Sequence, residues 1–149
     1  MTVLSGSSSA EIPAPIARCW TVVEAIDEAP DWQTGLERVE VLERDDQGRA
    51  FVCDTVNDVR FTKVHCRVRL AYDPPHRLTF TRVASEDVDA MDGSWELEEL
   101  GSGRTRATYN LAVDPGPVPV LARPLVKALR PLVVGNRAGE LARAVAARG

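Results

Sequence analysis

Gly93-Ser94-Trp95-Glu96-Leu97 is the last of three short sequence fragments that decide the fold of this chain. The first is Ala14-Pro15, followed after three residues by Cys19-Trp20, and the second is Pro30-Asp31-Trp32, which leads into Val39-Glu40-Val41-Leu42-Glu43. Alternating apolar and polar residues in the last two fragments indicate strands with one buried face. The prolines of the first two fragments favour a helix start and a helix end.

The rest of the chain extends this pattern into a series of strands. Ile16, Trp20 and Val23 recur at helical spacing, so a short helix is expected from Pro15 and a shorter one is expected to end at Pro30. The expected strands are residues 2–12, 36–44, 50–56, 61–72, 77–84, 91–100 and 105–113. Most of these strands are joined by segments of turn length, which predicts an antiparallel meander.

Together, the three fragments resemble the polyketide cyclase/dehydrase branch of the START-like superfamily, also called SRPBCC or Bet v 1-like, over about residues 7–145. The resemblance implies an α+β helix-grip fold, in which a curved antiparallel sheet of about seven strands surrounds a long, kinked C-terminal helix, with two short helices after the first strand. It also implies an apolar cavity between sheet and helix. With 149 residues, the chain is expected to form one domain, residues 1–149.

Alternation along the strands assigns side chains to the two faces of the sheet. Successive side chains point in opposite directions, so the apolar residues of strand 61–72 face inward and its basic residues face outward. On strand 50–56, Phe51, Cys53 and Thr55 form the expected inward set. The resemblance adds Trp32 at the cavity entrance, with packing in the core as the alternative. The predicted ligand-binding residues are Trp32, Val64, Cys66, Phe80, Arg82, Met91, Trp95 and Tyr109.

The predicted lining mixes large rings with small residues such as Gly93 and Ala107, which predicts uneven filling of the interior. We therefore expect a cavity of about 300 to 1,000 Å³, the usual range for small-molecule sites.

Arg82 is the one charged side chain that the strand pattern turns inward, because it shares a face with Leu78 and Phe80. A buried guanidinium without a partner is costly. Arg82 is therefore expected either to pair with an interior acid such as Asp54 or to contact a ligand oxygen.

The C-terminal segment, residues 117–148, is expected to form the helix that the sheet surrounds. Its first half carries leucines on one face and basic residues on the opposite face. Pro131 lies inside this pattern and is expected to bend or break the helix. The apolar face then continues at Val134, Leu141 and Val145.

Composition and charge exclude several classes of function. A net charge of −4 and a pI near 5.2 argue against nucleic-acid binding, which requires a dense basic surface. Residues 118–134 are apolar on average, but charges and prolines interrupt them, so stable membrane insertion is not expected.

The chain lacks the pattern of a metal or redox site. Cys19, Cys53 and Cys66 lack the paired spacing of such sites, so free thiols in a cytoplasmic protein are expected. His65 is expected on an outer face and His76 in a turn, and neither converges with other ligands. No metal or other cofactor is predicted.

These patterns favour the binding of a hydrophobic small molecule, lipid-like or polyketide-like, in an internal cavity. One alternative is an enzyme of the aromatase/cyclase type, in which Arg82 polarises a carbonyl and Tyr109 donates a proton. In the cyclases that the chain resembles, the strand equivalent to residues 61–72 carries inward tryptophan and arginine, whereas Arg67 and Arg69 are predicted to face outward. No catalytic residue is therefore assigned.

A second alternative is a partner-binding protein related to quinone chaperones or ribosome-associated members of the superfamily, with the cavity serving only as its core. The sequence sets neither the identity of the ligand nor the oligomeric state.

Overall fold

The structure of the chain, a computed structural model, describes residues 3–60, 62–117 and 135–148. The strands are β1 (Leu4–Ile12), β2 (Leu36–Arg44), β3 (Ala50–Asp58), β4 (Lys63–Asp73), β5 (Arg77–Ala84), β6 (Ala90–Gly101) and β7 (Arg104–Asp114). The helices are α1 (Ile16–Glu24), the 3₁₀ helix η1 (Ile26–Asp31) and α4 (Arg137–Arg148). The bounds of β2 and β5 are those predicted, and β3 extends two residues further than expected, to Asp58.

All seven strands form one antiparallel sheet in the order β1-β7-β6-β5-β4-β3-β2. The first two strands of the chain are therefore its two edges, and α1 and η1 connect them. This is the helix-grip fold that the sequence predicted. From β2 to β7 each strand pairs with the next one along the chain, so these six strands form the predicted antiparallel meander.

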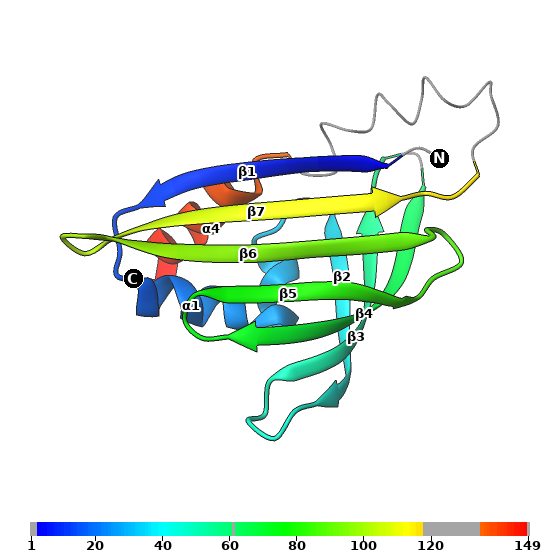
Figure 1. The fold of residues 1–149 in the computed structure, drawn as a ribbon, viewed down its shortest axis with the longest axis horizontal. Coiled ribbons are helices and arrows are strands. Elements are labelled where there is room, and N and C mark those ends of the chain that lie inside the picture. Colours follow the sequence, from blue (N-terminus) through cyan, green and yellow to red (C-terminus); the bar gives the residue numbers. More distant parts are fainter. Residues whose placement is uncertain (1–2, 61, 118–134, 149) are drawn as a thin grey trace.

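Curvature gives the sheet a concave face. Figure 1 shows β1, β7 and β6 running along the length of the molecule, whereas β2 crosses that direction at the other edge. Register shifts between β2 and β3, for example between Val41 and Glu43, bend this edge, because bulges increase the local twist of a strand. The curled sheet leaves room for side chains, and for a cavity, on its concave side.

The predicted faces of the central strands are confirmed. On β4, Cys66, Val68 and Leu70 are buried, and the basic residues between them are exposed. The inward residues of β6 and β7 are buried in the same way, including Trp95 and Tyr109. The sheet therefore presents one apolar face to the core and a charged face to solvent.

The two short helices lie where the prolines indicated. Pro15 has extended backbone angles and directly precedes α1, whose Trp20 and Val23 are buried while Ile16 packs against the core. Pro30 lies within η1, which ends one residue later at Asp31. α1 packs against β6, β7 and α4, and η1 packs against β2.

The described part of the C-terminal helix, α4, packs against β1 and α1. Leu141 and Val145 form its buried face, as the sequence predicted, together with Ala138 and Ala144. The predicted leucine face and the bend at Pro131 lie outside the described residues. None of the described helices is long and apolar enough to span a membrane.

Candidate ligand-binding cavity

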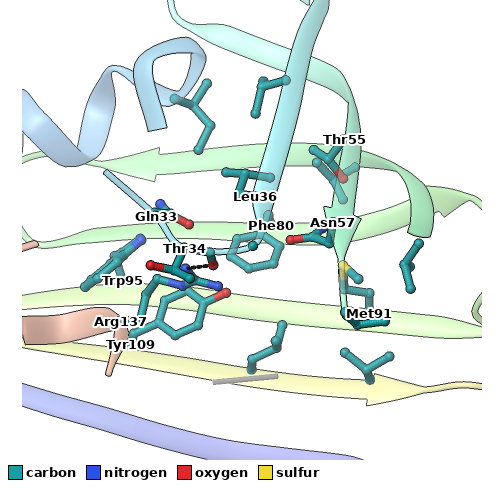
Figure 2. Close-up of a pocket in the computed structure, with 18 of the residues that line it drawn as sticks. Gln33, Thr34, Leu36, Thr55, Asn57, Phe80, Met91, Trp95, Tyr109 and Arg137 are labelled. Carbon is teal, nitrogen blue, oxygen red and sulfur yellow. Dashed lines mark hydrogen bonds between the residues drawn. The ribbon is translucent and has the colours of Figure 1, made fainter. Parts of the chain in front are cut away.

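An apolar cavity of about 140 Å³ lies between the concave face of the sheet and the start of α4. Strands β2 to β7 all contribute to its wall, together with residues 33–35 before β2 and Arg137 of α4 (Figure 2). Thr34 and Asp58 are its exposed lining residues and mark its rim. The volume is below the predicted range of about 300 to 1,000 Å³, because inward-facing rings pack against one another and occupy much of the interior.

Three aromatic side chains form one wall of the cavity. The ring centroids of Trp95 and Tyr109, directly opposite each other on β6 and β7, lie 4.9 Å apart. Phe80 of β5 stacks on Tyr109 at 6.3 Å with an interplanar angle of 26°. Offset and tilted rings at these separations attract one another, so the three rings form a preformed aromatic wall.

Arg137, at the start of α4, supplies the polar end of the cavity. One terminal nitrogen, Nη1, donates to the carbonyl oxygen of Thr34 at 2.7 Å and to Glu140 Oε1 at 3.0 Å. The guanidinium carbon lies 5.7 Å from the centroid of the Tyr109 ring. Glu140 Oε2 also accepts from the backbone N–H of Thr34. These contacts tie α4 to the loop before β2.

Two further groups at the polar end of the cavity, the Arg137 Nε and the Tyr109 hydroxyl, are potential hydrogen-bond donors. Arg137 is only 7% exposed, and its Nε finds no hydrogen-bond partner among the described residues. An unsatisfied buried donor of this kind costs about 1 to 3 kcal/mol or more. Burial raises the pKa of the Tyr109 hydroxyl, although the positive charge of Arg137 and a hydrogen-bonding interaction with its side chain act in the opposite direction. Tyr109 is therefore a neutral phenol at neutral pH and can donate a hydrogen bond.

Five of the eight predicted ligand-binding residues line the cavity, namely Val64, Phe80, Met91, Trp95 and Tyr109. They come from β4, β5, β6 and β7, which the sheet order places side by side. Their role in binding a ligand stays a prediction. The other three, Trp32, Cys66 and Arg82, lie elsewhere.

Trp32 lies behind the aromatic wall and not at the cavity surface. Its ring centroid is 5.9 Å from that of Trp95, with the planes tilted by 53°. Its indole Nε1 is buried and has no partner within the described parts of the chain. Trp32 thus supports Trp95, because η1 ends at Asp31 and turns the ring toward the core.

Arg82 does not pair with Asp54, the interior acid predicted as one possible partner, and it does not line the cavity. Its Nε donates to the carbonyl oxygen of Val88 at 2.9 Å, and its Nη2 donates to that of Ser85 at 3.0 Å. Pairing between β5 and β6 ends at Thr81, so the loop before β6 passes within reach of the Arg82 side chain. These two hydrogen bonds join the end of β5 to the loop before β6.

Asp54, the predicted interior acid, pairs instead with Arg67 on the solvent side of the sheet, with 2.8 Å between Oδ1 and Nε. The hydrogen bond from Arg67 lowers the pKa of the Asp54 carboxyl. The two residues are directly opposite each other on β3 and β4, and both face outward.

Cys66 is buried in the core but contributes no surface to the cavity. It borders a separate, open depression of about 790 Å³ that is lined by β2 to β5 and the loop after β5, where charged residues such as Arg67 and Asp54 pair with each other. Cys19, Cys53 and Cys66 are free thiols. Burial raises the pKa of Cys53 and of Cys66 to about 11, so both thiols are protonated at neutral pH.

The prediction from sequence did not include the polar lining residues Gln33, Thr34, Asn57, Asp58 and Arg137. Gln33 is only 8% exposed although it belongs to a loop. Asn57 lies two residues beyond Thr55 on the same face of β3, so a longer predicted strand would have found it. Arg137 lies on a helix whose orientation the sequence does not fix. No group of three or more potential metal ligands occurs among the described residues.

Comparison with known protein families places this cavity in context. Residues 4–147 match the model of a family described as polyketide cyclase/dehydrase and lipid transport. The chain belongs to this family. The match covers the whole sheet, α1, η1 and nearly all of α4, so the cavity is built within the part of the chain that defines the family. No curated protein matches the sequence significantly.

Solved structures share the same fold. A START superfamily protein from Mycobacterium smegmatis has a TM-score of 0.82 at 18% identity, covering 97% of this chain and 99% of its own. The Zhui aromatase/cyclase from a Streptomyces species has a TM-score of 0.82 at 16% identity, covering 99% and 96%. A protein from Thermus thermophilus has a TM-score of 0.82 at 22% identity, covering 97% and 99%. Family and fold together support a ligand-binding fold.

Proposed function

We propose that this protein binds a hydrophobic small molecule in the cavity between its sheet and α4. The observation that supports the proposal is the preformed apolar cavity with an aromatic wall of Phe80, Trp95 and Tyr109. Ligand sites are usually of this kind, with mainly apolar walls and a few polar groups that orient the ligand. Arg137 and Gln33 are such groups here.

The size of the cavity sets the part of a ligand that fits. An engineered cavity of about 150 Å³ in another protein accommodates benzene, so 140 Å³ suits one ring or the end of an aliphatic chain. A longer lipid-like or polyketide-like ligand would extend past the rim at Thr34 and Asp58. We therefore expect the aromatic wall to hold the terminal ring or chain of such a ligand.

An enzyme of the aromatase/cyclase type is the second candidate, and Tyr109 is the observation that favours it. Its hydroxyl is in the cavity and protonated at neutral pH, as a proton donor must be. Arg82 does not line the cavity, and its side chain donates to two backbone carbonyl oxygens, so Tyr109 is the stronger candidate for a catalytic group. Turnover of a polyketone that is abolished by Tyr109→Phe would favour the enzyme over the simple binding protein.

Native mass spectrometry of the purified protein, followed by solvent extraction, tests the proposal. We expect a bound apolar compound, or else binding of added one-ring probes such as ethylbenzene. Leu111→Phe adds bulk to the cavity wall and should abolish this binding, whereas Leu42→Phe, at a surface position that is 38% exposed, should leave it unchanged. Absence of any bound or added ligand would overturn the proposal, and so would equal affinity in the two variants.

The three thiols bear on where the protein works. We propose a cytoplasmic location, because free thiols persist in reducing compartments and Cys19, Cys53 and Cys66 are all free. Fractionation of the source cells with an antibody against the protein would test this directly. Recovery in an oxidising compartment would contradict it.

A further inference from the structure

We propose that Arg137 Nε is the polar anchor of the cavity, and that it selects ligands with a neutral acceptor oxygen, such as a ketone or ester carbonyl, over carboxylates. The inference deepens the proposed function and rests on it, since it concerns the same cavity. It assigns a binding role to a residue outside the aromatic wall. It also states which chemical group of the ligand lies at the start of α4.

The unpartnered Nε is the first observation. Arg137 lines the cavity, its side chain is 8% exposed, and its Nε has no hydrogen-bond partner in the described parts of the chain. Figure 2 shows the side chain reaching into the cavity between Thr34 and the Tyr109 ring. Buried donors in folded proteins nearly always have an acceptor. Nε itself is covered in this structure, so a ligand oxygen that supplies the missing acceptor displaces a neighbouring side chain at the start of α4.

One terminal nitrogen of the guanidinium, Nη1, is already held in place. It donates to the Thr34 carbonyl oxygen and to Glu140 Oε1. The guanidinium carbon lies over the Tyr109 ring, 5.7 Å from its centroid. The first turn of α4 is fixed as well, because Ser8 Oγ accepts from the N–H of Ala138. The Nε–H therefore has a fixed direction before any ligand binds, and little conformational entropy is lost on binding.

The charge around Arg137 favours a neutral ligand oxygen. Glu140 lies 3.0 Å from the guanidinium, and its side chain is only 10% exposed, so a buried positive charge is already balanced by a buried negative one. Asp58 adds a further acidic residue to the cavity rim. A carboxylate would bring a second negative charge into this weakly screened site, whereas a carbonyl adds none. Tyr109, a neutral phenol, does not offset that charge.

Three probes of one ring size test the inference, namely ethylbenzene without an acceptor, acetophenone with a neutral carbonyl, and benzoate with a carboxylate. Dissociation constants are measured at about pH 7.5, where Tyr109 is protonated, by isothermal titration calorimetry on the full chain. We expect acetophenone to bind about tenfold more tightly than ethylbenzene, the gain that one charge-assisted hydrogen bond provides. Benzoate should bind more weakly than either.

Two variants test whether Arg137 causes the preference for acetophenone over ethylbenzene. Arg137→Lys keeps the positive charge beside Glu140 but removes the Nε donor, and the double variant Arg137→Met, Glu140→Gln removes both charges together. Both should lose the tenfold preference for acetophenone over ethylbenzene, with the ratio of the two dissociation constants measured within each variant. Arg18→Lys is the control, because Arg18 is exposed and contacts the far end of α4 through the Val145 carbonyl. Thermal unfolding of each variant confirms that it is folded.

The outcomes separate this inference from the proposed function. If ethylbenzene and acetophenone bind equally well to the wild type, or if benzoate binds best, the cavity binds ligands but the inference is wrong. The inference is also wrong if folded Arg137→Lys retains the acetophenone preference. If no probe binds the wild type and no ligand is extracted from it, the proposed function fails and the inference fails with it.

Discussion

Gly93 determines where the aromatic wall of the cavity lies. It is directly opposite Phe80 on the neighbouring strand, and a Cβ at this position would lie 2.1 Å from the Phe80 ring. Its backbone is in an ordinary conformation, so the requirement for glycine here is one of space. Because Gly93 has no side chain, the ring of Phe80 packs directly on the backbone of β6 and lines the cavity without filling it.

Gly93→Ala should therefore push Phe80 into the cavity. We expect the free energy of unfolding to fall by about 1 to 3 kcal/mol, the usual cost of overpacking, together with a loss of ethylbenzene binding. Urea unfolding and calorimetric titration would measure these two effects. Adding Phe80→Leu to Gly93→Ala removes the clashing ring and should restore much of the lost stability; a double variant no more stable than Gly93→Ala would argue against this explanation.

Arg82→Met is expected to affect the fold and not ligand binding. The substitution removes two hydrogen bonds, to the carbonyl oxygens of Ser85 and Val88, and should lower the free energy of unfolding by about 1 to 3 kcal/mol. Affinity for one-ring probes should stay within about twofold, a margin of under about 1 kcal/mol, because Arg82 contributes no surface to the cavity. A large loss of affinity at unchanged stability would restore the ligand-binding role predicted from sequence.

The first turn of α4 and the loop before β2 together form the polar end of the cavity. Asn136 Oδ1 accepts from the N–H of Gly139 at 3.2 Å and caps the helix. Arg137 and Glu140 in the first turn then hold Thr34, in the loop before β2. The orientation of the cavity donor thus depends on a correctly formed helix end.

Asn136→Ala should loosen this end of α4. We expect a loss of about 1 kcal/mol in the free energy of unfolding, typical for an N-cap, and weaker binding of acetophenone but not of ethylbenzene. Asn136→Asp keeps an acceptor oxygen and should behave like the wild type, which makes it the matched control. Equal destabilisation by Asn136→Ala and Asn136→Asp would show that the cap does not contribute.

For the molecule as a whole, burial of the thiols makes stability depend on pH above neutrality. Cys53 and Cys66 have ordinary pKa values near 9, and burial raises both to about 11. Between these two values the unfolded chain has lost the thiol protons while the folded chain retains them. Stability from this source is therefore fully present below about pH 9 and is lost as the pH rises toward 11.

We predict that the free energy of unfolding falls from pH 9 to pH 11, by at most about 1.4 kcal/mol per pH unit for each thiol. Tyrosines titrate in the same range, so the wild type is compared with the double variant Cys53→Ala, Cys66→Ala by urea unfolding at each pH. The stability difference between the two proteins should narrow as the pH rises. A constant difference across the range would rule out the thiols as the cause.

Local sequence patterns were enough to predict the sheet and its two faces. Alternation of apolar and polar residues on β4, β6 and β7 is a local property, since successive side chains of any strand point in opposite directions. Short links between strands fixed the antiparallel order, and Pro15 and Pro30 marked the helices between β1 and β2. Five cavity residues followed from these rules alone.

How the interior is filled, and which polar groups reach it, depends on contacts between segments that are distant in sequence. The hydrogen-bond partners of Arg82 depend on where the pairing of β5 and β6 stops. The position of the Trp32 ring depends on where η1 ends. Arg137 enters the cavity because α4, distant in sequence, packs against β1 and contacts the loop before β2. Such contacts between distant segments depend on sheet curvature and helix position, which no local pattern encodes.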